Sequence, residues 1–336
     1  MLKGGPKRVH VLLASVILAS TCAAPARAEL SGGKLSLHLI GRYTPGARAV
    51  VASGPPVLKI LDLGPEMRRA MREYKRLWPQ GKTVLRVYTR RSYPRETDPT
   101  EAARDSWQTV LQPAVMSLPE EERRLIDYLE GPNECEHYPV WESAKTAGWH
   151  ARFWQALAPL IAKGGFLPCA GSIPVGNPPG PPDEIEAKML AFVPGLLAAN
   201  AVGGAWSYHA YSLKYGTDEA EETWTSLRYR MLHDMVARAH PELSRMPLII
   251  TEAGVDYRGD REKDGWQARG DRAKFESWLT WFDTRLREDD YVLGATLFQC
   301  GDVRGWPSFE TEPINGWLAG YLRSQVRVRP ADPTRP

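Results

Sequence analysis

Two glutamates stand beside short apolar segments and could carry acid–base or nucleophilic chemistry. The segment LIDYLEGPNE ends at Glu134, and the segment PLIITE ends at Glu252. Each predicts a strand that Gly or Pro interrupts abruptly. A pair of carboxylates presented in this way is the equipment with which glycosidic bonds are cleaved. For either glutamate alone, a solvated loop charge is the simpler interpretation, so the weight rests on the pair.

The elements that must position these glutamates alternate between strand-like and helix-like segments. Eight strand-like segments, each followed by a helix or loop, predict one α/β domain, a (β/α)8 or TIM barrel, over residues 29–326. The predicted strands cover residues 35–40, 57–63, 83–88, 125–130, 165–172, 203–209, 247–252 and 292–299. The predicted helices cover residues 64–78, 100–118, 143–162, 183–200, 219–239, 271–288 and 314–326, with a Pro-rich loop at 174–182.

The alternative arrangement is a doubly wound open sheet. Such a sheet would more often have fewer strands at this length, and often a glycine-rich phosphate loop after its first strand. Here GRYTP follows the first strand, and the chain has no G-x-G-x-x-G, Walker-type loop or H-E-x-x-H. In a barrel, the carboxyl ends of the strands carry the active site. The barrel therefore brings Glu134, after strand four, and Glu252, after strand seven, to one site.

This combination resembles the retaining glycoside hydrolases of clan A, families 5 and 39 in particular, which are built on a (β/α)8 barrel. In that clan an Asn-Glu pair after strand four supplies the acid/base, and a Glu after strand seven is the nucleophile. Asn133-Glu134 and Glu252 match both positions in order. Family 5-like members also have a His-x-Tyr after strand six, which His209 and Tyr211 match. The resemblance covers the layout of the mature chain, and its specific signal rests on about five residues.

The resemblance implies hydrolysis of an oligo- or polysaccharide through a covalent glycosyl-enzyme, with no cofactor and no metal. Glu252 would attack the anomeric carbon, and Glu134 would act as acid and then as base, across about 5–5.5 Å. Tyr211 would donate its hydroxyl to Glu252. Asn133 would bond the sugar 2-hydroxyl, and His209 would bind a hydroxyl or orient Tyr211.

Two further residues fit the clan pattern less closely. The clan has an Arg near the nucleophile, which we expect on strand two, yet Arg86 lies in the third predicted strand, VLRVY. A buried Arg needs a partner, and a carboxylate at the barrel mouth would supply one. The clan often ends strand eight with a Trp, where this chain has FQCGD, so Trp306 in the next loop is the candidate for stacking on sugar. This departure indicates a changed substrate or lost activity.

Three other functions stay open. A barrel that binds sugar without cutting it is favoured by the altered end of strand eight and opposed by the two glutamates. A metal-dependent hydrolase or an aldolase is disfavoured, because strand one has no His-x-His and strand six has no Lys. A transglycosylase would share all the catalytic residues.

Residues 1–28 are predicted to be a secretory signal peptide. A basic start precedes an apolar stretch, residues 11–19, that is too short to span a bilayer, and Ala26-Arg27-Ala28 is an A-x-A cleavage signal. We therefore expect a secreted or periplasmic protein with no membrane insertion after cleavage. Separately, we expect a monomer. The Pro- and Arg-rich tail, residues 327–336, is expected to be disordered.

Without the signal peptide the chain is nearly neutral. Of 43 basic and 40 acidic residues, four basic and no acidic ones lie in residues 1–28, which leaves 39 against 40. This balance gives no reason to expect nucleic acid or an anionic membrane as a partner.

Overall fold

The computed structural model describes residues 1–2, 29–134, 138–302 and 304–325. The predicted signal peptide, apart from its first two residues, and the predicted tail lie outside the described residues. Within the described ranges, no helix is both long and apolar enough to cross a membrane.

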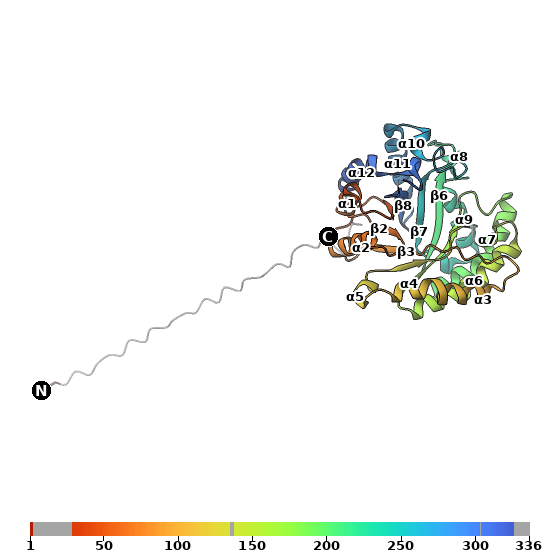
Figure 1. The fold of residues 1–336 in the computed structure, drawn as a ribbon, viewed down its shortest axis with the longest axis horizontal. Coiled ribbons are helices and arrows are strands. Elements are labelled where there is room, and N and C mark those ends of the chain that lie inside the picture. The colour runs from red at the N-terminus through yellow and green to blue at the C-terminus, as the bar shows by residue number, and fades with distance from the viewer. Residues whose placement is uncertain (3–28, 135–137, 303, 326–336) are drawn as a thin grey trace.

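Eight parallel strands close into a barrel in the order of the sequence (Figure 1). The ring closes where β8 pairs with β1, with Leu35 opposite Ala295. The closed order confirms the (β/α)8 barrel, because an open sheet would leave two unpaired edges. The strands are β1 (Leu35–Ile40), β2 (Val57–Leu61), β3 (Lys82–Arg86), β4 (Tyr128–Glu130), β5 (Leu167–Ile173), β6 (Ala205–Ser212), β7 (Leu248–Val255) and β8 (Val292–Cys300).

Helices surround the strands on the outside (Figure 1). They are α1 (Pro45–Val51), α2 (Pro65–Leu77), α3 (Pro99–Asp105), α4 (Gln112–Met116), α5 (Glu120–Arg123), α6 (Ala144–Lys163), α7 (Pro182–Asn200), α8 (Glu219–Glu222), α9 (Arg228–Ala239), α10 (Trp266–Arg269), α11 (Arg272–Arg287) and α12 (Glu312–Ser324). Three short helical turns complete the set: η1 (Ser106–Leu111), η2 (Pro241–Leu243) and η3 (Pro307–Phe309).

The helices form where an apolar face can pack on the barrel. In α2, the side chains of Met67, Met71 and Tyr74 recur at helical spacing and are all buried. Helix α1 was not predicted from the sequence. It is a short helix that begins with Pro45 and is capped by Thr44, whose hydroxyl accepts from the Ala47 amide at 3.1 Å. Local capping, rather than a long apolar stripe, is what starts this helix.

Of the strands that carry the site, β4 ends at Glu130 as predicted, whereas β6 and β7 run past their predicted ends. Strand β4 stops at Glu130, so Glu134 lies four residues further on, in a turn, with φ 44°. The prediction that strand seven ends at Glu252 was wrong, because β7 runs on to Val255. The small residues after Glu252 still pair with β6, with Tyr211 opposite Gly254. His209 and Tyr211 therefore also lie within a strand, since β6 extends to Ser212.

Candidate active site

A cleft with a volume of about 420 Å³ opens at the carboxyl ends of the strands. It brings together every predicted site residue except His209, which is fully buried. The residues that line it are Ile40, Leu61, Arg86, Tyr88, Asn133, Glu134, Tyr211, Glu252, Asp256, Gly259, Phe298, Asp302, Trp306 and Phe309.

The two glutamates face each other across this cleft. One carboxylate oxygen of Glu134 lies within 4.8 Å of one of Glu252, and a ring nitrogen of His209 lies within that distance of both. Retaining glycosidases have carboxyl groups about 5–5.5 Å apart, whereas inverting enzymes need about 6.5–9.5 Å to admit a water. A closest approach of 4.8 Å or less is shorter than the separation that an inverting enzyme needs.

Glu252 is held at both oxygens by residues of three other strands. Its Oε1 accepts from Arg86 Nη1 at 3.0 Å and from Lys59 Nζ at 3.2 Å. Its Oε2 accepts from the Tyr211 hydroxyl at 2.9 Å. Burial alone would raise the pKa of Glu252, but the charges of His209, Lys59 and their neighbours outweigh it and lower this pKa below its ordinary range. The carboxylate is therefore ionised at neutral pH.

His209 connects Glu134 to the interior of the barrel. It lies on β6 in register with Glu252, and its Nδ1 is 2.6 Å from Glu134 Oε1 and 3.6 Å from Glu252 Oε2. Burial lowers the pKa of His209, but the carboxylates of Glu252, Glu130 and Glu134 raise it to about 9. At neutral pH the ring is therefore an imidazolium, and its Nδ1–H group donates a hydrogen bond to Glu134. The bond that the structure records for this ring is with the acid/base candidate, whereas the sequence suggested a bond to Tyr211 or to a sugar hydroxyl.

Asn133 precedes Glu134 in the same turn and also lines the cleft. Its Oδ1 is buried and accepts no hydrogen bond from any residue that the structure describes. A buried amide oxygen without a partner is costly, so this atom is available to a ligand. The bond to a sugar 2-hydroxyl stays a prediction.

Two buried charges at the centre of the site were missed by the sequence reasoning. Lys59 on β2 has its Nζ 2.6 Å from Oε2 of Glu130, the last residue of β4. Oε1 of Glu130 accepts from Ser207 Oγ at 2.7 Å and from Ser172 Oγ at 3.1 Å. Burial would raise the pKa of Glu130, but Lys59 and the imidazolium of His209 hold it well below its usual range. The available signal was a single charge inside each of the apolar runs VLKIL and YLE.

Arg86 and Lys59 lie on neighbouring strands and both reach the nucleophile candidate. Arg86 lies on β3 and not on β2, as the sequence predicted, although β3 ends at Arg86 and not at residue 88. Its guanidinium still reaches the Glu252 carboxylate. Strand β2, where the clan's arginine was expected, supplies the second cation, Lys59, instead.

An aromatic wall closes the side of the cleft near β8. The ring of Phe298, on β8, meets Trp306 edge-on at 5.3 Å and Phe309 at 5.6 Å, and Trp306 meets Phe309 at 5.5 Å. Strand β8 therefore does present an aromatic ring to the cleft, a Phe in place of the Trp that the clan often has. Stacking of a sugar on Trp306 stays a prediction.

Glu134, His209 and Glu252 are close enough together to be considered as metal ligands. Their other neighbours argue against that role. Lys59 and Arg86 both donate to Oε1 of Glu252, and Tyr211 donates to Oε2. A divalent cation there would have to displace these donors and would lie beside two positive charges. The donor set fits a paired carboxylate better than a metal.

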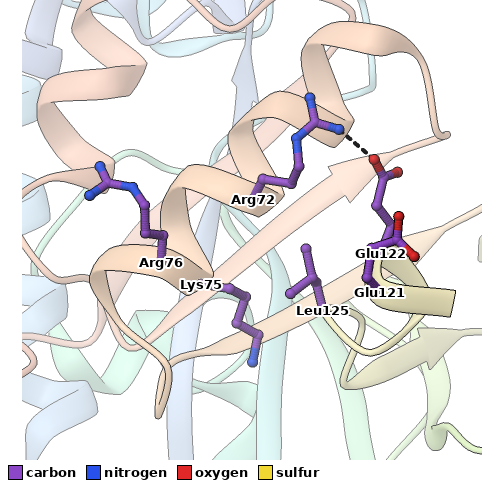
Figure 2. A pocket seen from close by; sticks show the side chains of 6 residues that line it. All are labelled: Arg72, Lys75, Arg76, Glu121, Glu122 and Leu125. Atoms are coloured by element: carbon purple, nitrogen blue, oxygen red, sulfur yellow. Dashed lines mark hydrogen bonds and ion pairs between the residues drawn. The ribbon is translucent and has the colours of Figure 1, made fainter. Parts of the chain in front are cut away.

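A second hollow lies between α2 and α5 (Figure 2) and shares no lining residue with this cleft. Its basic residues are largely paired, since Glu122 accepts from Arg72 Nη1 at 2.6 Å and from Arg68, and Lys75 lies 2.5 Å from Asp127. These pairs join α2 to α5 and to the β3–β4 region, and we assign them a structural role. The hollow is lined by Arg72, Lys75, Arg76, Glu121, Glu122 and Leu125.

No protein-family model matches the chain, and no curated protein matches it. Similar solved structures include PbGH5A, a glycoside hydrolase family 5 enzyme from Prevotella bryantii B14, with 10% identity, 86% of this chain and 95% of that chain covered, and a TM-score of 0.49. A β-mannanase from Streptomyces thermolilacinus is 16% identical, with 84% and 86% covered and a TM-score of 0.45. A β-glucosidase from Exiguobacterium marinum is 11% identical, with 88% and 99% covered and a TM-score of 0.44. Similarity this distant leaves the activity of this chain to be inferred from its own side chains.

Proposed function

We propose that this protein is a retaining glycoside hydrolase that cleaves an O-glycosidic bond of an oligo- or polysaccharide through a covalent glycosyl-enzyme. The observation that carries the proposal is the approach of Glu134 and Glu252 to within 4.8 Å at the mouth of the barrel. That spacing leaves room for a sugar carbon between the carboxyl groups, and too little for the water that an inverting mechanism places there.

In the first step, Glu252 attacks the anomeric carbon and forms an ester, while Glu134 gives a proton to the leaving oxygen. The nucleophile must be ionised, and the cations around Glu252 keep it so. Glu134 must hold a proton at the moment of cleavage. The 2.6 Å contact between its Oε1 and His209 Nδ1 places an exchangeable proton beside the acid.

In the second step, Glu134 accepts a proton from water, the oxygen of this water attacks the anomeric carbon, and the ester bond to Glu252 breaks. The departing carboxylate regains a full negative charge. Arg86, Lys59 and Tyr211 already point at its two oxygens, so this charge forms among donors that need no reorganisation.

Binding of the sugar is assigned to the walls of the cleft. The Phe298 and Trp306 rings offer apolar surface for the C–H face of a sugar, and Asn133 offers its unpaired amide oxygen to a hydroxyl. Export is also part of the proposal. It is tested by N-terminal sequencing of the mature protein, which should begin at Glu29.

The test is labelling of the mature chain with 2-deoxy-2-fluoro glycosides of the gluco, manno and xylo series, read by intact mass and peptide mapping. An adduct on Glu252 is expected. Glu252→Gln should give no adduct, and Glu262→Gln, a change at an exposed loop residue, should be labelled like the wild type.

Two outcomes would replace the proposal. Binding of sugar by a folded protein that hydrolyses no glycan and forms no adduct would establish a sugar-binding barrel, which the altered end of strand eight favours. Glycosyl transfer that dominates over hydrolysis at high acceptor concentration would establish a transglycosylase with the same catalytic pair.

A further inference from the structure

One layer below the mouth of the barrel, β2 places a lysine in the interior. Ile40 pairs with Leu61 at the mouth, and two residues earlier His38 pairs with Lys59. The Lys59 side chain has no exposed surface. Barrel interiors are ordinarily filled with branched apolar residues, and a buried ion pair stabilises a fold little more than apolar packing does. Packing alone therefore does not account for a lysine here.

The Lys59 ammonium is fixed between two carboxylates. Its Nζ lies 2.6 Å from Glu130 Oε2 and 3.2 Å from Glu252 Oε1. Glu130 is fixed in turn, because Ser207 and Ser172 both donate to its other oxygen. With the stem enclosed and the head held by Glu130, the lysine has little freedom to leave Glu252.

Arg86 and Lys59 reach the same oxygen of Glu252 from different levels. Arg86 lies at the mouth, with 11% of its side chain exposed, whereas Lys59 is wholly enclosed. Two donors on Oε1 and the Tyr211 hydroxyl on Oε2 leave the carboxylate one orientation.

From this geometry we infer that Lys59, clamped by Glu130, is a positioning residue for the nucleophile, which it orients and keeps anionic from inside the barrel. The inference rests on the proposed function for its catalytic meaning, but its effect on Glu252 can be measured without turnover. Glu130 thus has a part in the site although it does not line the cleft.

Other charged groups also face Glu252 and must be held constant in a test. The ionisable groups around it, strand by strand, are His38 on β1, Lys59 on β2, Arg86 on β3, Glu130 and Glu134 on and after β4, and His209 and Tyr211 on β6. Lys59→Met alone would leave Glu130 charged and unpaired in the barrel, so the comparison is made in a background that already lacks this charge.

The experiment compares Glu130→Gln with the double variant Lys59→Met/Glu130→Gln, which differ only in the lysine. Protein labelled with ¹³C at glutamate side-chain carboxyls is titrated by NMR, and the Glu252 signal is assigned by its loss in Glu252→Gln. Glu252 should titrate about one pH unit or more higher in the double variant than in Glu130→Gln, because it has lost one adjacent opposite charge. Lys75→Met, which removes an ion pair distant from the cleft, should leave the Glu252 titration unchanged.

Equal Glu252 titrations in Glu130→Gln and the double variant, with both folded, would overturn the inference. If the Lys59→Met double variant does not fold, Lys59→Gln in the same Glu130→Gln background allows the same comparison, because Gln removes the charge but keeps a neutral hydrogen-bond donor. In the labelling assay, loss of the lysine should slow breakdown of the glycosyl-enzyme about tenfold, the equivalent of one pKa unit. A wild type that titrates as expected but hydrolyses no glycan and forms no adduct would refute the hydrolase proposal and leave the role of Lys59 intact.

Discussion

Replacing Tyr211 by Phe should slow the breakdown of the glycosyl-enzyme more than its formation. The Tyr211 side chain is buried, and its hydroxyl donates to Glu252 Oε2 at 2.9 Å. Its ring meets Phe298 edge-on at 6.4 Å, a contact that a Phe at position 211 retains. The substitution therefore removes one hydrogen bond to the nucleophile and little else.

The magnitude follows from the charge on Glu252 during the reaction. A hydrogen bond to a charged group contributes about 1.5–3 kcal/mol. In formation, the Glu252 carboxylate starts with a full charge and loses part of it in the transition state. The hydrogen bond therefore stabilises the resting state at least as much as the transition state, and its loss should change the rate of formation little. In breakdown, negative charge returns to Glu252 in the transition state, so loss of the hydrogen bond raises the activation free energy. At about 1.4 kcal/mol per tenfold, breakdown should slow by roughly 10- to 150-fold.

The assay is a rapid-mixing experiment with an aryl glycoside that has a good leaving group, followed by intact mass at steady state. Tyr211→Phe should show a burst of released phenol and a population of glycosyl-enzyme larger than in the wild type. Tyr215→Phe is the matched control, because Tyr215 is also buried and its hydroxyl has no hydrogen-bond partner among the described residues. Equal slowing of both steps, with no accumulation, would refute this account of the hydroxyl.

Three other changes probe the acid/base, the aromatic wall and the buried imidazolium. Glu134→Ala should abolish turnover of substrates with poor leaving groups, whereas substrates with good leaving groups should still form the glycosyl-enzyme, which then breaks down slowly because the base is missing. Azide should then restore activity and yield a glycosyl azide of retained configuration by NMR, and an inverted product would contradict the assigned mechanism. Trp306→Ala should raise KM about two- to tenfold with kcat little changed, from about 0.5–1.5 kcal/mol of lost ring contact; an unchanged KM would exclude stacking there. The pKa of His209 is raised from 6.5 to about 9, so its contribution to stability is complete below pH 6.5 and is lost as pH rises through 9. That contribution is roughly 3 kcal/mol. Urea unfolding should therefore show a fall in stability from pH 6.5 to 9 that His209→Asn lacks, and parallel curves would contradict it.

Much of the fold could be predicted because alternation of apolar runs with helical segments leaves few arrangements of this length. Not every strand end could: β1 and the end of β4 lie where predicted, whereas β6 and β7 run past their predicted ends. Strand β7 continues past Gly254 because its residues pair with β6. A single sequence does not show which strand a segment pairs with, or in which register. The late start of β4, at Tyr128 and not at residue 125, has the same origin.

Some residues of the candidate site could also be predicted from the sequence, and others could not. Glu134, Glu252 and Tyr211 were identifiable because the clan pattern names them and the barrel brings strand ends together. Lys59 and Glu130 were not, because a charge in an apolar run indicates neither which face of the strand it occupies nor what lies opposite. Only closure of the barrel shows that β2 and β4 direct these two side chains to the same point inside it.

Two departures from the clan pattern bear on whether the site is active, and the structure answers both with neighbouring residues. The arginine near the nucleophile comes from β3 instead of β2, yet Arg86 pairs with Leu61 at the end of β2 and still reaches Glu252. Strand β2 contributes a cation one layer deeper, so Oε1 receives two donors. At β8, Phe298 stands in the cleft beside Trp306. Decay of a catalytic site would remove partners and leave buried charges unpaired at a cost of several kcal/mol each. Here each charge around Glu252 has its counter-charge, which is why we infer a working nucleophile rather than a vestigial one.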